Sequence, residues 1–174
     1  VGNYDFLIGD TVSEDPAISY SEIPRFAPEC FAYIRNSSTA KFKRFREGLD
    51  QLLKEGVAQA FELPDSLQRI PLLGAVGPLQ FEVMQYRLES EYSAECRVES
   101  AAWQYVRWPL DKVTGTPLIE RPDLMLPTGC TLARDGFGQW VVLLPSSWTA
   151  AYLEEKNSAF AFLPTPPSAR QPAA

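Results

Sequence analysis

Histidine is absent from the 174-residue sequence. Without an imidazole, the chain has no histidine general base, no Ser-His or Cys-His nucleophile pair and no zinc site of the His-containing type. Cysteine is scarce as well: the sequence has Cys30, Cys96 and Cys130, and none of them belongs to a C-x-x-C pair. Their odd number and wide spacing argue against a disulfide framework or a structural metal, so we expect free, buried thiols in a reducing cytosol.

The sequence also lacks a long apolar segment and a leader peptide. Its longest uncharged run, residues 136–153, includes Gln139 and Pro145 and is too polar to span a bilayer. The opening residues, VGNYDF, contain no basic segment of the kind that begins a signal peptide. We therefore expect a soluble, cytoplasmic protein that contacts no membrane.

No Gly-Lys dipeptide occurs in the sequence, which excludes a P-loop. Residues 74–77, GAVG, lie between a predicted strand and a predicted helix, where backbone amides can hold an anion. This stretch lacks the third glycine of a dinucleotide-binding fingerprint, and Pro78 removes one amide donor. A tight turn with close strand–helix packing is therefore the simpler interpretation. Because no nucleophile, base and oxyanion donors are grouped, we expect no catalytic centre, cofactor or metal in this chain.

Charge of both signs is present, but it is distributed unevenly. The formal net charge is −6, yet residues 31–60 carry six basic and three acidic side chains between two acidic stretches. An acidic chain binds nucleic acid poorly as a whole, because phosphate neutralisation supplies most of the non-specific affinity. We expect no DNA binding, and only the stretch from Arg35 to Lys54 can provide a local basic patch.

The basic cluster of that stretch consists of Lys41, Lys43, Arg44 and Arg46, which lie outside the apolar arc of a predicted helix. If they face solvent, these side chains can contact the phosphates of a nucleic acid. The alternative is a solvated helix face in which Lys41 and Arg44 lack a partner and the other two form the intrahelical pairs Lys43–Glu47 and Arg46–Asp50. From the residues alone, the solvated face is the simpler interpretation.

Two further groups of side chains have a functional and a structural interpretation. Trp103, Tyr105 and Arg107 share one side of a predicted strand and could stack nucleobases, but packing in a core explains them more simply. Glu82 and Glu89 share a helix stripe without a pocket or a basic partner nearby, as expected of a solvated face.

The periodicity of apolar residues predicts alternating strands and helices over residues 30–108. Strands are expected at 30–35, 57–63, 70–76 and 94–108, and helices at about 40–54 and 78–92. Ser37, Ser38 and Thr39 offer N-caps for the first helix, and Gly56 is a plausible C′ residue. The resulting β-α-β-β-α-β order predicts an α+β, ferredoxin-like split sandwich.

The second predicted helix has two apolar faces. Leu79, Val83 and Tyr86 lie on one side, and roughly opposite them lie Phe81, Met84, Leu88 and Tyr92. A helix that is apolar on opposite sides usually packs against another part of the protein on each of those sides. We expect the sheet to cover one face and a smaller C-terminal annex to cover the other. The annex should contain a β-hairpin at 131–144, a short helix capped by Ser146 and Ser147, and a last strand at 159–163.

These elements divide the chain into four parts. Residues 1–19 are expected to be a remnant of a preceding β domain and its linker, because the strand-like residues 6–12 have no partner nearby. Residues 20–109 should form the ferredoxin-like α/β domain, and residues 110–163 the annex of the same domain. Residues 164–174, which contain four prolines, are expected to be a loose tail.

Several stretches of the sequence resemble the C-terminal part of the bacterial class II peptide-chain release factors, translational GTPases related to elongation factor G. They are residues 8–11 (IGDT), 23–29 (IPRFAPE), 48–56 (GLDQLLKEG), 74–81 (GAVGPLQF) and 87–92 (RLESEY). Each stretch is short, but their order and spacing over residues 6–100 make the resemblance specific. From residue 124 to residue 144 the chain is nearly uncharged and departs from the pattern of that family.

The resemblance implies a protein with a GTPase domain, a β-barrel domain and this third, α/β domain, so residues 1–19 would include the last barrel strand. It implies a role in translation termination, in which the GTP form binds the ribosome after peptide release and drives off the class I release factor. GTP and magnesium would belong to the GTPase domain, which leaves this chain without a cofactor of its own. The expected partners are the ribosome, through its RNA and proteins, and class I release factors indirectly, with the chain itself a monomer.

Two other functions remain open on the residues alone. Ferredoxin-like folds often sense small molecules, and a fold does not by itself determine a function, so the chain could be a stand-alone ligand-sensing module. It could also contact only other proteins, through the aromatic side chains of the annex.

Overall fold

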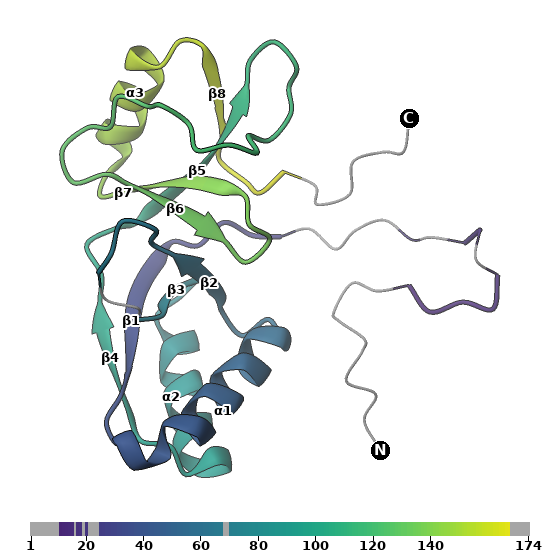
Figure 1. The fold of residues 1–174 in the computed structure, drawn as a ribbon, viewed down its shortest axis with the longest axis vertical. Helices are drawn as coiled ribbons and strands as arrows, with labels where there is room; N and C mark the ends of the chain where they lie inside the picture. The colour runs from purple at the N-terminus through teal and green to yellow at the C-terminus, as the bar shows by residue number, and fades with distance from the viewer. Residues whose placement is uncertain (1–10, 16, 19, 21–24, 68–69, 168–174) are drawn as a thin grey trace.

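The strands of both halves of the chain join into one sheet (Figure 1). The computed structural model describes residues 11–15, 17–18, 20, 25–67 and 70–167. Within these ranges, the eight-stranded sheet has the order β4-β1-β3-β2-β6-β7-β5-β8. Each neighbouring pair of strands is antiparallel. Most of the strand predicted at 6–12 and most of the tail predicted at 164–174 lie outside the described residues.

The lower half of the molecule in Figure 1 has the predicted β-α-β-β-α-β order. Its elements are β1 (Cys30–Asn36), α1 (Phe42–Lys54), β2 (Gln59–Glu62), β3 (Leu72–Ala75), α2 (Leu79–Tyr92) and β4 (Cys96–Ser100). Their strands take the order β4-β1-β3-β2, and both helices share one buried cluster with one face of these strands. The α+β, ferredoxin-like fold is therefore confirmed.

Helix α1 begins without the side-chain cap that the sequence suggests. A 3₁₀ turn, η1 (Thr39–Lys41), precedes it, and Ser38, the N-cap of that turn, makes no side-chain capping hydrogen bond. Asn36 organises this turn instead: its side-chain amide donates to the carbonyl oxygen of Ser38, and its Oδ1 accepts from the Ser38 N–H at 3.2 Å. The predicted side-chain cap at residues 37–39 is not formed, so that prediction was wrong, and the Asn36 side chain instead fixes the turn at Ser38 that leads into the helix.

The end of α1 is as predicted. Gly56 has a φ of 73°, the left-handed conformation that favours glycine at this position. Its N–H donates to Leu53, and the next N–H, that of Val57, donates to Leu52, which completes a Schellman motif.

The strand predicted over residues 94–108 is two strands. Strand β4 ends at Ser100, and β5 (Tyr105–Asp111) begins after a break in which the indole of Trp103 donates to the carbonyl oxygen of Gly129 at 2.9 Å. Strand β4 pairs with β1, whereas β5 pairs with β7 and β8. The chain thus crosses from one half of the sheet to the other at this break, which the sequence alternation does not reveal.

The upper half contains the hairpin, helix and last strand predicted for the annex. They are β6 (Thr131–Asp135), β7 (Trp140–Leu144), α3 (Ser147–Lys156) and β8 (Phe160–Leu163). Strands β6 and β7 pair as a hairpin. The Ser146 hydroxyl accepts from the Thr149 N–H at 3.3 Å in a capping box, so the predicted cap of this helix is confirmed.

Shared buried side chains hold the two halves together. Strands β2 and β6 pair over only two positions, Phe61 with Asp135 and Glu62 with Arg134. Around this short seam lies a buried cluster to which both halves contribute, made of Phe31, Phe61, Leu72, Val106, Trp108, Ala133, Val141 and Leu143. Burial of this apolar surface stabilises the junction more than the backbone pairing of β2 and β6 at two positions can.

The annex does not cover the second face of α2, contrary to the prediction. Phe81, Met84 and Leu88 are buried against the sheet, as expected. Helix α3 instead covers strands of its own half, with Ala150 and Leu153 packed against Leu132 and Val142. It lies at the opposite end of the molecule from α2 (Figure 1). The prediction was wrong because the apolar side of the annex helix is occupied by its own strands.

Candidate functional site

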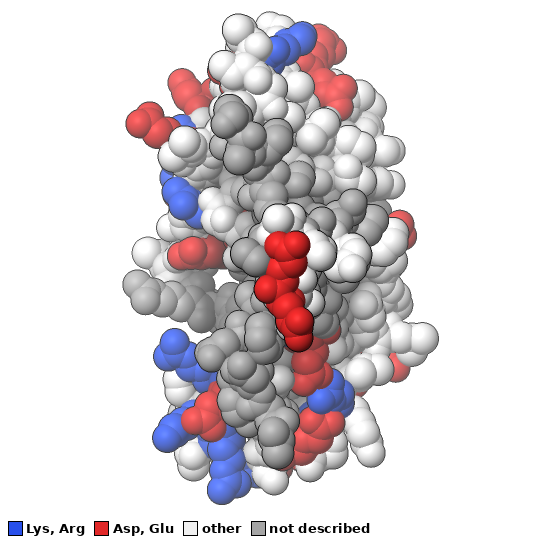
Figure 2. All heavy atoms as spheres, turned by 90° about the vertical axis from the view of Figure 1, so that its right-hand side faces the viewer, with Lys and Arg blue, Asp and Glu red and all other residues white. Residues whose placement is uncertain are grey.

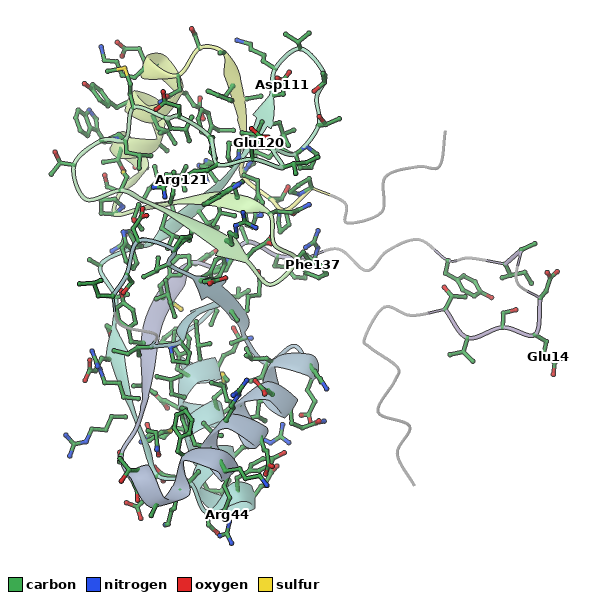
Figure 3. The ribbon with its side chains drawn as sticks, in the orientation of Figure 1. Glu14, Arg44, Asp111, Glu120, Arg121 and Phe137 are labelled. Carbon is green, nitrogen blue, oxygen red and sulfur yellow. The ribbon has the colours of Figure 1, made fainter. Side chains whose placement is uncertain are left out.

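The predicted basic cluster lies at the start of α1. Phe45, Leu49 and Leu52 are buried beneath the helix, which turns the intervening charged side chains outward. Lys43, Arg44 and Arg46 are exposed, and Lys41, in η1, is half-buried. Figure 3 shows Arg44 projecting from the lower end of the molecule, away from the sheet. The fold therefore places all four predicted residues at one end of α1.

The ion pairs of the cluster differ in part from those expected. Lys43 pairs with Glu47 at 3.9 Å, as the spacing suggests. Lys41, expected to be unpaired, lies 3.6 Å from Glu95 after the last turn of α2. Among the described residues, neither Arg44 nor Arg46 forms an ion pair, so the predicted pairing of Arg46 with Asp50 was wrong. The structure thus leaves two guanidinium groups available to an outside partner.

The position of these cations in the helix opposes helix stability. The N-terminus of a helix carries a partial positive charge, which makes acidic side chains favourable there and basic ones unfavourable. The first turn of α1 has no acidic residue and no side-chain cap. Lys43 and Arg44, in this first turn, therefore add positive charge where the helix dipole is already positive, which favours binding of an anion. Lys and Arg side chains gather at the lower left of the face shown in Figure 2, with some acidic side chains between them.

The chemistry of the cluster suits phosphate. A guanidinium group presents a planar fork of donors that can bind two phosphate oxygens at once. The Lys43–Glu47 pair is long and solvent-exposed, and such pairs contribute little to stability, so its ammonium can exchange Glu47 for a phosphate. The arrangement supports contact with a nucleic-acid backbone and offers nothing that reads bases.

The GAVG turn does not form an anion cradle. The Oε1 atom of Gln80 accepts hydrogen bonds from the N–H groups of Val76 at 2.8 Å and Gly77 at 3.1 Å. Its Nε2 donates to the carbonyl oxygen of Val57 at 3.0 Å, which fixes the side chain in place. At Gly74 an added Cβ would lie 2.7 Å from the ring of Phe61, so the backbone passes close to its neighbours. The interpretation as a tightly packed turn is confirmed.

Trp103, Tyr105 and Arg107 do not form a stacking platform. Trp103 precedes β5 and packs against the buried cluster at the seam, with its ring edge-on to Tyr33 at 6.4 Å between centroids. Tyr105 packs against the separate cluster under α3. Arg107 donates from Nη1 to the carbonyl oxygen of Val106 and borders a shallow hollow of about 400 Å³. Packing in the core, the simpler interpretation, is confirmed for the two aromatic residues.

The three cysteines are free thiols, as predicted, but the prediction that all are buried was wrong: Cys96 is buried, whereas Cys30 and Cys130 are half-buried. Burial raises the pKa of Cys96 to about 11, and it raises the pKa values of Cys30 and Cys130 as well. A thiol that stays protonated at neutral pH is a poor nucleophile and a poor metal ligand.

One basic residue of interest was missed at the level of sequence. Arg97 on β4 is exposed and lies opposite Arg35 of β1 in the strand register. The Arg35 guanidinium pairs with Glu99 at 2.8 Å. Both arginines point to the face of the sheet away from the helices, because the residues that alternate with them, Ile34 and Val98, pack in the cluster under the helices. Only strand pairing brings the two together, so no local pattern could have indicated it.

The helices of the described ranges are too short or too polar to cross a bilayer. Within the same ranges, no cluster of three or more Cys, Asp or Glu side chains is arranged to hold a metal ion.

Comparison with known proteins adds to this geometry. Residues 20–154 match the family described as "Class II release factor RF3, C-terminal domain". A protein of Cyanothece sp. named peptide chain release factor 3 is 39% identical over 145 residues, which cover 83% of this chain and 26% of that protein. The protein of the same name from Synechococcus elongatus is 40% identical over 149 residues, covering 86% and 26%. That from Synechocystis sp. is 36% identical over 165 residues, covering 92% and 29%.

The chain spans about a quarter of the length of these relatives. The family match, by contrast, covers most of the chain, from the residues before β1 to the last turn of α3. The chain therefore belongs to the family of class II release factor RF3 C-terminal domains.

Proposed function

We propose that this chain is the ribosome-docking domain of a translation-termination factor. The proposal is supported by membership of the release factor family over residues 20–154, together with the exposed guanidinium groups of Arg44 and Arg46, which form no ion pair with any described residue. Within a longer protein, the domain would help to promote the GTP-dependent dissociation of class I release factors after peptide release. The cytoplasm, where ribosomes work, would be its location.

Docking would rest on phosphate contacts from the start of α1. Arg44 and Arg46 contact ribosomal RNA without breaking an ion pair, because no described acidic side chain pairs with them. Lys43 joins them when it exchanges Glu47 for a phosphate oxygen. Lys41 stays beside Glu95 and positions the turn that precedes the helix. Contacts of this kind hold a protein on the RNA backbone and depend on its shape more than on its sequence.

Guanine nucleotide and magnesium would bind elsewhere in the full-length protein. The residues of this chain do not fit the phosphates of a nucleotide, since the amides of the GAVG turn are already hydrogen-bonded to Gln80. In this proposal the chain is a monomeric, non-catalytic part of a GTPase. Its own residues bind and orient, and hydrolysis takes place in another domain.

Co-sedimentation of the 174-residue chain with 70S ribosomes tests the proposal. We expect binding in 50 mM salt that falls by an order of magnitude or more at 200 mM, because each phosphate contact releases counterions. Isolated 30S and 50S subunits in parallel show which subunit carries the site. Failure to sediment at 50 mM salt, or sedimentation that salt does not weaken, would contradict docking through a basic cluster.

A further inference from the structure

A row of apolar side chains on α2 faces solvent. We call Leu79, Val83 and Tyr86 the apolar stripe; they follow one another at helical spacing, and their exposed fractions are 68%, 48% and 71%. The opposite side of the same helix, with Phe81, Met84 and Leu88, is buried against the sheet. The buried side of α2 is therefore sufficient to pack the helix against the sheet. The apolar stripe is not needed for this packing.

Single exposed apolar residues are common on proteins, but a continuous row is not. Leu79, Val83 and Tyr86 cover two turns of α2, and Val76, in the turn before the helix, is also exposed. Contiguous apolar surface of this kind marks a site of interaction with another macromolecule. Tyrosine is also enriched among the residues that contribute most of the free energy of binding at protein interfaces.

The borders of the apolar stripe are acidic. Glu82 and Glu89, seven residues apart on α2, lie along one border, and both are exposed. Along the other border, Glu55 and Glu91 share a single cation, Arg87, which lies 2.7 Å from Glu91. No described basic side chain forms an ion pair with Glu82 or Glu89. The Glu89 carboxylate accepts a hydrogen bond from the side-chain amide of Gln85 at 3.2 Å. The stripe is thus an apolar row in a negatively charged frame.

This charge decides between possible occupants. The acidic frame repels the phosphates of RNA, and nothing on the stripe could neutralise them. A second copy of the chain would bring the same negative frame against itself, on a chain whose formal net charge is −6. The occupant that complements both the apolar row and its borders is a protein segment that carries aliphatic and basic side chains together.

We propose that the apolar stripe of α2 binds a basic, amphipathic segment of another protein. Aliphatic side chains of the partner pack on Leu79 and Val83, and its lysine or arginine side chains pair with Glu82 and Glu89. Tyr86 supplies an aromatic face on which a cation can also rest. This surface is separate from the basic cluster of α1 and has the opposite charge, so the inference does not depend on ribosome docking.

A synthetic 18-residue helical peptide with leucine along one face and lysine on its flanks is the probe. We expect it to bind the 174-residue chain and to shift the backbone amide resonances of residues 76–90 in a nitrogen-15 correlation spectrum. Val83→Asp should weaken binding tenfold or more, because it places a charge in the middle of the apolar contact. Ile119→Asp, which makes the same change at an exposed position of the annex, should leave the affinity unchanged.

Charge exchange provides the decisive comparison. The double variant Glu82→Lys with Glu89→Lys should lose affinity for the lysine peptide about tenfold and gain affinity for a version in which glutamate replaces every lysine. The correlation spectrum of each variant without peptide verifies that the fold is retained. Equal binding of the two peptides, shifts that map outside residues 76–90, or displacement of the peptide by single-stranded RNA would overturn the proposal. The proposal would also be overturned if the chain associated with itself and the Val83→Asp substitution abolished that association.

Discussion

The indole Nε1 of Trp108 donates a hydrogen bond of 3.0 Å to Oδ2 of Asp135, and both side chains are buried. The other carboxylate oxygen of Asp135 accepts the N–H groups of Phe137 at 3.0 Å and Gln139 at 2.9 Å. Asp135 also lies opposite Phe61 where β6 meets β2. One carboxylate therefore closes the β6–β7 turn, anchors β5 and stands at the seam between the two halves.

Replacement of Asp135 by alanine should destabilise the whole chain. The substitution leaves the buried Trp108 N–H and two backbone N–H groups without their acceptor, which we expect to lower the free energy of unfolding by about 2–3 kcal/mol. Urea denaturation monitored by tryptophan fluorescence measures the change. Asp111→Ala is the matched control, because Asp111 also accepts two backbone N–H groups, at 2.8 and 2.9 Å, but in an exposed turn. Equal losses for the two variants would mean that burial of the Trp108–Asp135 pair has no effect.

Close contact between the two helices of the lower half depends on Gly48. A Cβ atom there would lie 2.6 Å from the ring of Tyr92 and 2.9 Å from Leu88. Alanine is favoured over glycine in a helix by about 1 kcal/mol, but the clash should outweigh this, with a net loss of about 1–2 kcal/mol. Gly77→Ala is the control, since a Cβ at Gly77 meets nothing within 4 Å.

The second half of this test uses Tyr92. In a Tyr92→Ala background the ring nearest to the new methyl group is gone and only the flexible end of Leu88 remains close to it, so Gly48→Ala should cost clearly less than in the unsubstituted chain. A double-mutant cycle on the unfolding free energies isolates this coupling. Additive effects of the two substitutions would show that the ring and the glycine do not constrain each other.

Acid should weaken the link between α1 and α2 through Arg87. Hydrogen bonds from the Arg87 guanidinium hold the pKa values of Glu55 and Glu91 below the usual 4.5. A carboxyl whose pKa is lower in the folded state stabilises the fold above its unfolded pKa, and the contribution is lost as the pH falls through the folded value. Arg87→Met should therefore lower the urea midpoint at pH 7, with the difference from the unsubstituted chain shrinking as the pH falls below 4.5.

Arg46→Met is the control for this pH dependence, because Arg46 forms no ion pair among the described residues. The difference between its urea midpoint and that of the unsubstituted chain should stay small and constant from pH 7 to pH 3. A difference for Arg87→Met that stays constant over the same range would show that its effect comes from the packing of the side-chain stem, and not from the two carboxylates.

Local patterns account for the parts of the fold that could be predicted. The buried positions of α1 and α2 recur at helical spacing, and Gly56 and Ser146 mark the end of one helix and the start of another, so these elements follow from residues close in sequence. The break between β4 and β5 depends on Trp103 meeting Gly129, a contact across 26 positions. Periodicity carries no information about such a partner.

The same distinction applies to the candidate sites. Exposure of Lys43, Arg44 and Arg46 follows from their place outside the apolar arc of the helix, and the structure confirms it. That Glu95 pairs with Lys41 depends on how α2 crosses α1, and the sequence could not show it. The two apolar faces of α2 were visible from the sequence, but periodicity shows only that a face is apolar. Whether another part of the chain covers it is decided by the tertiary structure.

Reversal of charge at the start of α1 tests the central proposal most directly. The variant Arg44→Glu with Arg46→Glu removes the two exposed guanidinium groups, and Lys112→Glu with Lys156→Glu makes the same change in net charge in the annex. Association with 70S ribosomes is measured for both variants and for the unsubstituted chain from 50 to 300 mM salt. We predict that the α1 variant binds at least tenfold more weakly at 50 mM, while the annex variant binds like the unsubstituted chain. The slope of log affinity against log salt should fall by about one for each phosphate that the α1 variant no longer neutralises. Equally weakened binding in the two variants, or full binding in both, would contradict docking through the basic cluster of α1.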